Sequence, residues 1–404
     1  MEKYEKSKDT MNLPRLDLLI YAHDGRGLGH ASRSIAIGMA FRRLFPEKTV
    51  LFVSGCKLSA AFIGQAPLDW VKLPAYETTV VEGKSRGTKG TSNFSDADLG
   101  RFRSRTIHDL VSLYRPRCVL ADHSPQGKHK ELLPAIKKSL DDDTRWVLGI
   151  RGVVGGVPQV FSDLAMSTFQ SYYHALIWYG DSGVLGNGPI KELLDQFGKT
   201  PIETGYISRL AEWVHWQATS PRTKSTLAGT ISIPWIGEYT RQVLSNLADA
   251  LRKIGNTFGN WRLFVGMPGK PIDVEAIYAF FHDLPFCSVE PAGDRYPEAL
   301  INCRTALIYG GYNSLMDILW AKMPAVVLLR TMQDHEQENH VTKLQPKRTS
   351  GMIVFHEQKA TPDNLARALT TLLQRPVVTE QNINMDGAAN TAGYLATLID
   401  KPAG

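Results

Sequence analysis

The sequence lacks several features that would mark a membrane, secreted or metal-binding protein. No apolar run approaches the roughly 20 residues of a transmembrane helix, and the charged first residues, 1–9, do not form a signal peptide. The cysteines form neither a C-x-x-C pair nor a His/Cys cluster with metal spacing. We therefore expect a cytoplasmic protein with reduced, mostly buried thiols at Cys56, Cys118, Cys287 and Cys303.

Signatures of nucleic-acid binding are also missing. The basic residues are scattered along the chain, and no zinc finger, helix-turn-helix or RNP motif accompanies them. The net charge of +6 at pH 7 suits an anionic partner, such as a nucleotide diphosphate or an acidic membrane surface. Charge alone does not choose among these partners, but the missing motifs argue against nucleic acid.

What the sequence does contain is an alternation of short apolar runs and helical patterns, which is typical of parallel βαβ units. With 404 residues, the chain is long enough for two domains. In the first half, strands are expected at 16–22, 49–53, 70–73, 118–121, 146–150 and 175–178. Helices are expected at 31–44, 97–113, 128–139, 159–168 and 189–196.

The alternation breaks at 205–224 and then restarts, so the second half predicts another doubly wound sheet. Its strands are expected at 226–233, 262–265, 286–289, 306–309 and 325–328. Its helices are expected at 239–254, 273–282, 296–302 and 314–321. The polar, glycine-rich stretch 77–93 is too uneven for a regular element and is expected to be a mobile loop.

A glycine-rich segment, 25–30, follows the first expected strand and opens the first long helix. Backbone N–H groups and the positive end of the helix dipole make such a turn a place for an anion. The segment lacks the G-x-G-x-x-G spacing, because His30 directly follows Gly29. Histidine can act as a general base or can bind a phosphate or hydroxyl. The alternative, that His30 only caps the helix, stays open.

A second glycine turn, Gly310 and Gly311, also lies between an expected strand and an expected helix. The amides of Asn313 and Ser314 would face whatever binds at that helix N-terminus. Asp317, one turn further on, could hold two ribose hydroxyls or could compensate the helix dipole. The polar run that begins soon after the next strand, 333–340, is either a solvated helix start or a substrate-facing loop.

Beyond these local patterns, the sequence resembles GT-B glycosyltransferases, in particular a family of bacterial glycosyltransferases related to the lipid II-forming N-acetylglucosaminyltransferase of peptidoglycan synthesis. The segment 305–344 is similar to the nucleotide-sugar half of that transferase, where a glycine turn precedes an acidic residue and then D-H-Q-x-x-N-A. The N-terminal matches keep the order and spacing of the family: 22–24, 27–30 and 33; 121–122, 125, 127 and 131–134; 179–181; and 204–206.

The resemblance implies an α/β protein of the GT-B fold, in which two Rossmann-like, doubly wound domains face a cleft. The acceptor would bind mainly to an N-terminal domain (15–215) and a UDP-sugar mainly to a C-terminal domain (216–380), and transfer would invert the anomeric carbon. Outside the domains lie a flexible tail (1–14) and a C-terminal segment (381–404) that can pack back on the N-terminal domain. No cofactor and no metal are expected, because helix N-termini and basic side chains usually stabilise the diphosphate in this fold.

The resemblance also gives roles to single residues. His30 matches a loop histidine that assists acceptor deprotonation, and Asp24 and Asp122 are alternative bases because both follow expected strands. Arg33 and Arg330 are candidates for binding phosphate charge. The expected donor-binding residues are Gly29, Arg33, Gly310, Gly311, Asn313, Ser314, Asp317, Arg330, Glu336 and Gln337.

Within that donor set, Asp317 matches a ribose-binding glutamate, and Glu336 and Gln337 match a segment that contacts the donor sugar. Three places depart from the family: the stretch 232–238 lacks a run of glycines, Gly152 replaces an aspartate after an arginine, and Glu336 interrupts the D-H-Q pattern. These departures leave two alternatives of the same fold. One is a nucleotide-sugar hydrolase or epimerase, and the other is an inactive binding protein.

The acceptor is not identified by any motif. If the resemblance holds, the basic stretch 77–93 would lie near it and could contact a phosphate or a lipid headgroup, or could have no role. The sequence is accordingly compatible with a small-molecule, peptide or lipid-linked acceptor and with peripheral binding at the inner face of a membrane.

Overall fold

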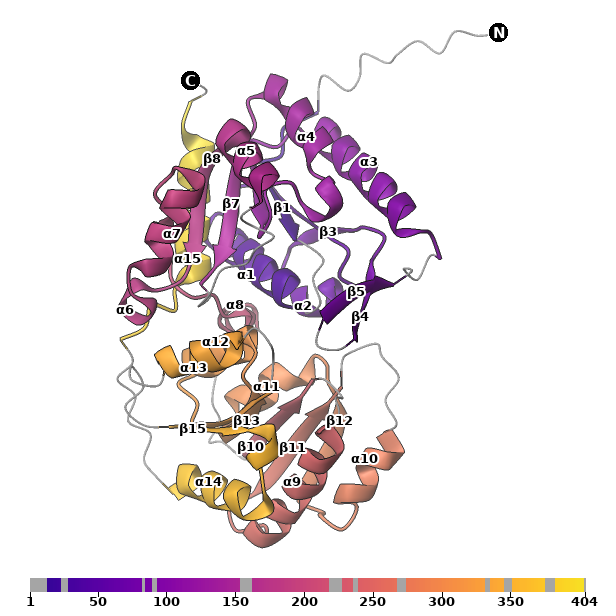
Figure 1. Cartoon of the computed structure of the whole chain (residues 1–404), viewed down its shortest axis with the longest axis vertical. Helices are drawn as coiled ribbons and strands as arrows, with labels where there is room; N and C mark the ends of the chain where they lie inside the picture. Colours follow the sequence, from indigo (N-terminus) through magenta and orange to yellow (C-terminus); the bar gives the residue numbers. More distant parts are fainter. Residues whose placement is uncertain are drawn as a thin grey trace.

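The computed structural model describes residues 13–22, 28–81, 84–88, 93–152, 162–217, 227–234, 239–266, 274–330, 335–344, 351–374 and 382–402. These residues form two α/β domains that contact each other through a few helices (Figure 1). No helix in this described part of the chain is both long and apolar enough to cross a membrane.

The N-terminal domain contains a seven-stranded parallel sheet in the order β3-β2-β1-β6-β7-β8-β9. Its strands are β1 (Leu18–Ala22), β2 (Val50–Ser54), β3 (Asp69–Lys72), β6 (Cys118–Asp122), β7 (Arg145–Arg151), β8 (Tyr173–Tyr179) and β9 (Ile202–Glu203). Its helices are α1 (Gly29–Leu44), α2 (Ser59–Ile63), α3 (Asp96–Tyr114), α4 (Leu133–Lys138), α5 (Asp163–Tyr172), α6 (Ser182–Leu185), α7 (Gly188–Phe197) and α8 (Arg209–Trp216), with short 3₁₀ turns η2 (Lys128–Lys130) and η3 (Ser139–Asp142).

The C-terminal domain contains a six-stranded parallel sheet in the order β12-β11-β10-β13-β14-β15. Its strands are β10 (Leu227–Ile233), β11 (Asn260–Val265), β12 (Cys287–Pro291), β13 (Cys303–Tyr309), β14 (Ala325–Leu329) and β15 (Met352–His356). Its helices are α9 (Thr240–Ile254), α10 (Val274–Phe281), α11 (Arg295–Ile301), α12 (Tyr312–Trp320), α13 (Glu336–Leu344) and α14 (Pro362–Gln374), and η5 spans Glu357–Lys359.

Both sheets are covered by helices on their two faces, which explains why the sequence shows continuous apolar runs at the central strands. All five residues of β1, β2, β6 and β14 are buried. The helices bury one side only: in α9 the buried residues include Val243, Leu247 and Leu251, which recur every four positions. Since all strands of a sheet run parallel, their carboxyl ends meet at one edge, and in each domain that edge lies toward the other domain (Figure 1).

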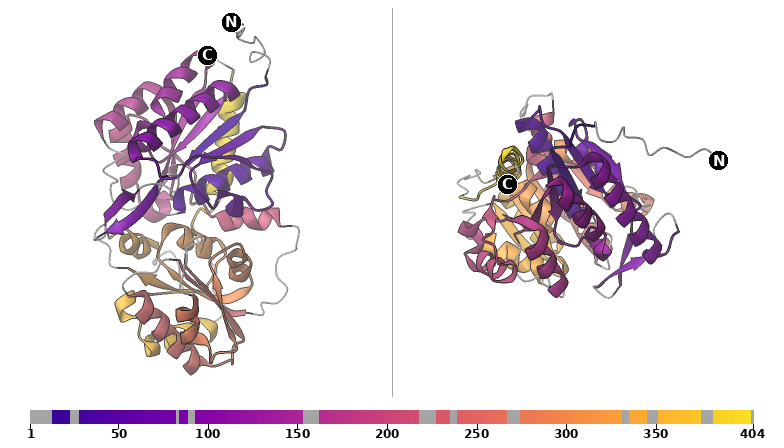
Figure 2. Two further views of the ribbon diagram at one scale, coloured as in Figure 1. Left: turned by 90° about the vertical axis from the view of Figure 1, so that its right-hand side faces the viewer. Right: turned by 90° about the horizontal axis from the view of Figure 1, so that it is seen from above.

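The chain returns to the N-terminal domain at its end. Helix α15 (Gly387–Asp400) packs against α1, and its residues Ala392 and Leu395 belong to the same buried cluster as Ile35 (Figures 1 and 2). The N–H of Asn384, just before α15, donates to the Asp181 carboxylate at 2.7 Å. The N-terminal domain is therefore assembled from both ends of the chain.

Three expectations from the sequence are wrong. The stretch 77–93 is not a loop throughout, because β4 (Glu77–Val81) and β5 (Lys84–Thr88) pair as an antiparallel hairpin. The helix expected at 128–139 is interrupted, because His129 adopts a left-handed φ of 51° and only η2, α4 and η3 form. The break expected at 205–224 contains α8, whose first turn is capped by the Ser208 hydroxyl.

Candidate active site between the two domains

His30 lies in the first turn of α1, and its Nδ1 is hydrogen-bonded to the carboxylate of Asp122. Asp122 is the last residue of β6, the strand beside β1, so the topology brings the two residues together at the carboxyl edge of the sheet. The Asp122 side chain is buried, whereas 18% of the His30 side chain is exposed. Asp122 therefore lies inside the domain, and His30 lies at the domain boundary.

Arg33 completes this cluster from the next turn of α1. Its Nη2 donates to Asp122 Oδ1 at 2.6 Å and lies 3.3 Å from His30 Nδ1. Burial alone would raise the pKa of Asp122, but the positive charge of Arg33 and the contact with His30 outweigh it and hold this pKa below its usual range. Asp122 therefore stays ionised near neutral pH and is a weak proton acceptor, and its role as an alternative base stays a prediction.

The ionised carboxylate fixes the tautomer of His30. A carboxylate can only accept a hydrogen bond, so in neutral His30 the proton sits on Nδ1 and the lone pair on Nε2. Because the ring is partly exposed, Nε2 can accept a proton from a molecule that binds at the domain boundary. Of the expected bases, Asp24 lies outside the described residues, and between His30 and Asp122 the geometry favours His30.

His123, which the sequence reasoning missed, adjoins this cluster. Its ring centroid lies 5.0 Å from that of His30, and its backbone has a left-handed φ of 74°, which is unusual for a residue other than glycine. Burial, with smaller effects of neighbouring charges, lowers the pKa of His123 to about 3, so this imidazole is neutral at physiological pH. Its position directly after Asp122 was the only signal in the sequence.

The described end of the first glycine segment, 28–30, faces the second segment across the domain boundary, and 25–27 lie outside the described residues. A Cβ atom added to Gly29 would lie 3.7 Å from Nδ2 of Asn313, so the first turns of α1 and α12 are neighbours. Two helix N-termini, with their unpaired N–H groups and positive dipole ends, therefore converge beside His30. That arrangement suits an anionic group such as a diphosphate.

The two glycines before α12 have different surroundings. A Cβ atom added to Gly310 would lie 2.9 Å from Leu329 Cδ2, so a larger residue there would have to displace this leucine, whereas nothing lies within 4 Å of such an atom on Gly311. Asn313 and Ser314, in the first turn of α12, are half-buried. Gly311 thus leaves room for a ligand to approach the backbone.

The donor-side carboxylate Asp317 is placed differently from what the resemblance implies. Its Oδ1 accepts hydrogen bonds from Ser208 Oγ at 2.7 Å and from Leu210 N at 3.3 Å, both at the start of α8 in the other domain. Burial raises the pKa of Asp317, and Arg209 and these hydrogen bonds oppose that rise. In this arrangement Asp317 binds a helix N-terminus of the N-terminal domain, and its role on a ribose stays a prediction.

Glu336 and Gln337 open α13 and lie at the same boundary. Glu336 Oε2 accepts from Arg151 Nη2 at 2.8 Å, which links α13 to the end of β7. Gln337 Oε1 is buried and, among the described residues, has no hydrogen-bond partner, and the same holds for Nε2 of His340. Buried polar atoms without partners are uncommon, so these two atoms mark a place where water or a ligand can bind.

Arg330, the other expected phosphate ligand, follows β14. Its guanidinium lies 4.3 Å from the ring centroid of Tyr309, and its Nε is 3.8 Å from Glu357 Oε2. The Tyr309 hydroxyl donates to that same carboxylate oxygen at 3.0 Å. Arg330 therefore has a nearby carboxylate that balances its charge, at the carboxyl edge of the C-terminal sheet.

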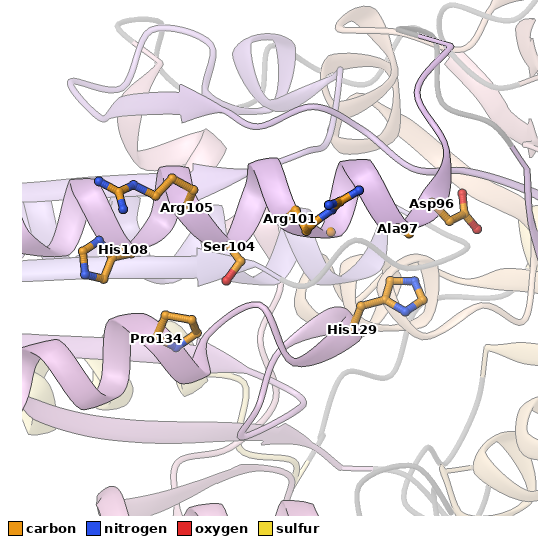
Figure 3. A pocket seen from close by; sticks show the side chains of 9 residues that line it. Asp96, Ala97, Arg101, Ser104, Arg105, His108, His129 and Pro134 are labelled. Atoms are coloured by element: carbon orange, nitrogen blue, oxygen red, sulfur yellow. The ribbon is translucent and has the colours of Figure 1, made fainter.

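A separate groove of about 780 Å³ runs along α3 on the N-terminal domain (Figure 3). It is lined by Asp96, Ala97, Gly100, Arg101, Ser104, Arg105, His108, His129 and Pro134. The space exists because the side of α3 that faces the η2 turn carries the small residues Ala97, Gly100 and Ser104. Arg101 and Arg105 are paired with Asp98 and Asp109, respectively, so the charges along the groove are largely balanced.

The altered stretch 232–238 is only partly described. Ser232 and Ile233 end β10, and 235–238 lie outside the described residues. Within the described part of the chain, no group of three or more His, Cys, Asp or Glu side chains could hold a metal ion.

Comparisons with known proteins find similar structures but no matching sequences. No model of a known protein family matches the sequence, and no curated protein sequence matches it either. MurG of Acinetobacter baumannii superposes with a TM-score of 0.52 at 13% identity over 96% of this chain and 99% of that chain. A UDP-N-acetylglucosamine 2-epimerase gives 0.61 at 12% identity over 95% of both chains.

A third structure, Arabidopsis thaliana UGT89C1 complexed with UDP-L-rhamnose, gives a TM-score of 0.59 at 12% identity, over 96% of this chain and 100% of that one. Each comparison covers 95% or more of this chain, so the similarity extends over both domains. The chain therefore has the GT-B fold.

Proposed function

We propose that the protein is a glycosyltransferase that moves a sugar from a nucleotide-sugar donor, UDP-linked, to an acceptor hydroxyl. The observation that carries this proposal is the His30–Asp122 pair, whose histidine lies in the first turn of α1, where the N-termini of α1 and α12 are neighbours. A base and an anion-binding site side by side are what transfer from a sugar diphosphate requires. The fold shared with MurG and with UGT89C1 bound to UDP-L-rhamnose supports this reading.

In the proposed mechanism, the diphosphate of the donor binds at the two helix N-termini. Nε2 of His30 takes the proton of the acceptor hydroxyl, while ionised Asp122 holds Nδ1–H and stabilises the imidazolium that forms. The acceptor oxygen bonds to the anomeric carbon as the bond from that carbon to the diphosphate oxygen breaks. The leaving diphosphate keeps the electron pair, and helix N–H groups stabilise its charge.

A single direct displacement of this kind inverts the anomeric carbon and needs no metal, and both features belong to the proposal. On the acceptor side, we propose that part of the acceptor binds along the α3 groove, because His129 lines that groove and belongs to the same loop as His123, beside His30. A cytoplasmic location with peripheral contact to a membrane stays a prediction.

The donor is tested by thermal-shift measurements with UDP-, GDP-, dTDP- and CDP-sugars. The expected result is stabilisation by a UDP-sugar, which grows with ligand concentration as RT ln(1 + [L]/Kd). Mass spectrometry of reactions with pooled acceptors would then detect the transferred sugar. If no nucleotide-sugar stabilises a properly folded sample, the donor proposal is wrong.

A nucleotide-sugar hydrolase or epimerase is the second candidate, and the shared fold with a UDP-N-acetylglucosamine 2-epimerase favours it. In that case His30 would act on water or on a sugar proton instead of an acceptor hydroxyl. The two candidates are separated by incubating the enzyme with UDP-sugar and no acceptor. Rapid formation of free UDP or of an epimer under these conditions would replace the transferase proposal.

A further inference from the structure

Tyr312 connects the two domains directly beside the candidate site. It is the first residue of α12 and follows the Gly310–Gly311 turn, so it moves with the donor-side glycine segment. Its hydroxyl donates to the backbone oxygen of Tyr179 in the N-terminal domain at 3.1 Å. On its other side, its ring is stacked on His340 of α13, with a centroid distance of 5.7 Å and an interplanar angle of 12°.

The same tyrosine covers Arg33. The guanidinium carbon of Arg33 lies 5.5 Å from the ring centroid of Tyr179 and 5.9 Å from that of Tyr312, so one aromatic ring from each domain flanks it. Only 3% of Arg33 is exposed, and within the described part of the chain its buried Nε has no hydrogen-bond partner. The hydrogen bond to Asp122 and the two rings therefore determine where this guanidinium lies.

These contacts form a chain from the donor-side helix to the candidate base. Tyr312 contacts Arg33, Arg33 donates to Asp122, and Asp122 holds Nδ1 of His30. Each step joins neighbouring groups, and only the first crosses the domain boundary. Interfaces between domains of one chain generally allow relative motion, so this first step is the one that domain separation would break.

We propose that Tyr312 is a positioning residue that couples closure of the C-terminal domain to the readiness of His30 as a base. With the domains closed, the Tyr312 ring excludes water from Arg33 and keeps the guanidinium on Asp122, which then holds His30 in the tautomer with an unprotonated Nε2. With the domains apart, Arg33 is open to solvent and can leave Asp122, so the imidazole loses its fixed orientation. Acceptor deprotonation is thereby confined to the closed state, in which the donor-side helix is in place.

The coupling rests on the proposed function for its role in transfer, but its structural part can be measured without any substrate. The spectrum of ¹⁵N-histidine-labelled protein reports the tautomer and protonation of His30, whose signals are assigned by their loss in His30→Gln. In the wild type, the Nδ1–H tautomer is expected. In Tyr312→Leu, which removes the ring, a tautomer mixture and an altered titration curve are expected, whereas Tyr312→Phe, which keeps the ring, should resemble the wild type.

A matched control is Tyr278→Leu on α10, because the Tyr278 hydroxyl also donates to a backbone oxygen, that of Val289 at 2.9 Å, but within the C-terminal domain. In transfer assays, Tyr312→Leu should lower kcat about 10- to 100-fold with little change in the donor KM, and should shift the basic-group limb of the pH profile. Tyr312→Phe should stay within about threefold of the wild type, since it loses one hydrogen bond.

The outcomes separate the coupling from the proposed function. If the wild type transfers no sugar but Tyr312→Leu changes the His30 signals, the transferase proposal fails and the coupling stands. If Tyr312→Leu is folded and its His30 signals and pH profile equal those of the wild type, the coupling is wrong, even if kcat falls. Equal defects in Tyr312→Phe and Tyr312→Leu would also overturn it, because the hydroxyl and not the ring would then carry the effect.

Discussion

The glycine segments of the two domains open helices at corresponding places, yet the charged groups beside them are arranged differently. Next to the first turn of α1, His30, Arg33 and Asp122 contact one another within a single domain. In the C-terminal domain, Asp317 binds α8 and Glu336 binds Arg151, both across the domain boundary.

This difference shows that the hydrogen bonds of the His30 cluster form within one domain, whereas those of Asp317 and Glu336 form between the domains. The hydrogen bonds between His30, Arg33 and Asp122 all lie within the N-terminal domain, and the other domain contacts this cluster through the Tyr312 ring over Arg33. The acidic groups of the C-terminal domain instead hold the domains together. A donor that binds there would have to share or replace contacts that the protein makes with itself, and the following experiments test this distinction.

The largest effect is expected for His30→Gln. Removing the group that accepts the acceptor proton should lower kcat about 10²- to 10⁴-fold while leaving donor affinity and folding nearly unchanged. Initial rates at saturating donor and acceptor measure this effect, and His282→Gln on the exposed surface serves as a control. If the His30→Gln enzyme kept the rate of the control, His30 would not be the base, and the His30 cluster of the N-terminal domain would have no catalytic role.

Asp122→Asn should reduce the free energy of unfolding by about 3–5 kcal/mol, because it leaves Arg33 buried without its counter-charge. The pKa of Asp122 is depressed in the folded state, so its stabilisation is full above the unfolded value of about 4 and is lost as the pH falls toward the folded value. Urea unfolding at several pH values measures both effects. The stability difference between wild type and variant should shrink on acidification, and a difference that grows would contradict the assignment.

Asp317→Ala tests whether this carboxylate serves the fold or the donor. Loss of its hydrogen bonds to the start of α8 should cost about 0.5–2 kcal/mol of stability, similar to the loss of a helix cap, with UDP-sugar affinity changed less than about threefold. Isothermal titration and urea unfolding measure the two quantities. A donor affinity reduced about tenfold or more at nearly normal stability would instead support the ribose role.

The smallest effect is expected for the ion pair between Arg151 and Glu336, since both side chains are about one-quarter exposed. A double-mutant cycle with alanine at each position should give a coupling energy of about 0.5–1 kcal/mol that declines in high salt. The single variants should also make the domains separate more readily, which X-ray scattering detects as a larger radius of gyration. A coupling energy near zero at low salt would show that this pair does not hold the domains together.

Much of the fold could be predicted because it depends on residues close together in the sequence. The apolar run of β13 and the four-residue spacing of buried side chains in α9 are local patterns, and they predicted a strand and a helix at nearly the observed places. The hairpin of β4 and β5 was missed because its glycines and lysines give no alternating pattern, and pairing between strands stabilises it.

In the candidate site, too, some features follow from neighbouring residues and others from contacts between distant segments. By itself, the sequence determined that helices begin soon after β1 and β13 and that a histidine lies in the first turn of the former helix, because a helix start is set by neighbouring residues. Only the tertiary structure decided that Asp317 binds Ser208, that Glu336 binds Arg151 and that Tyr312 contacts Tyr179, since these partners are 109, 185 and 133 positions apart. Such partners are selected by the packing of two domains, and no spacing within either segment encodes them.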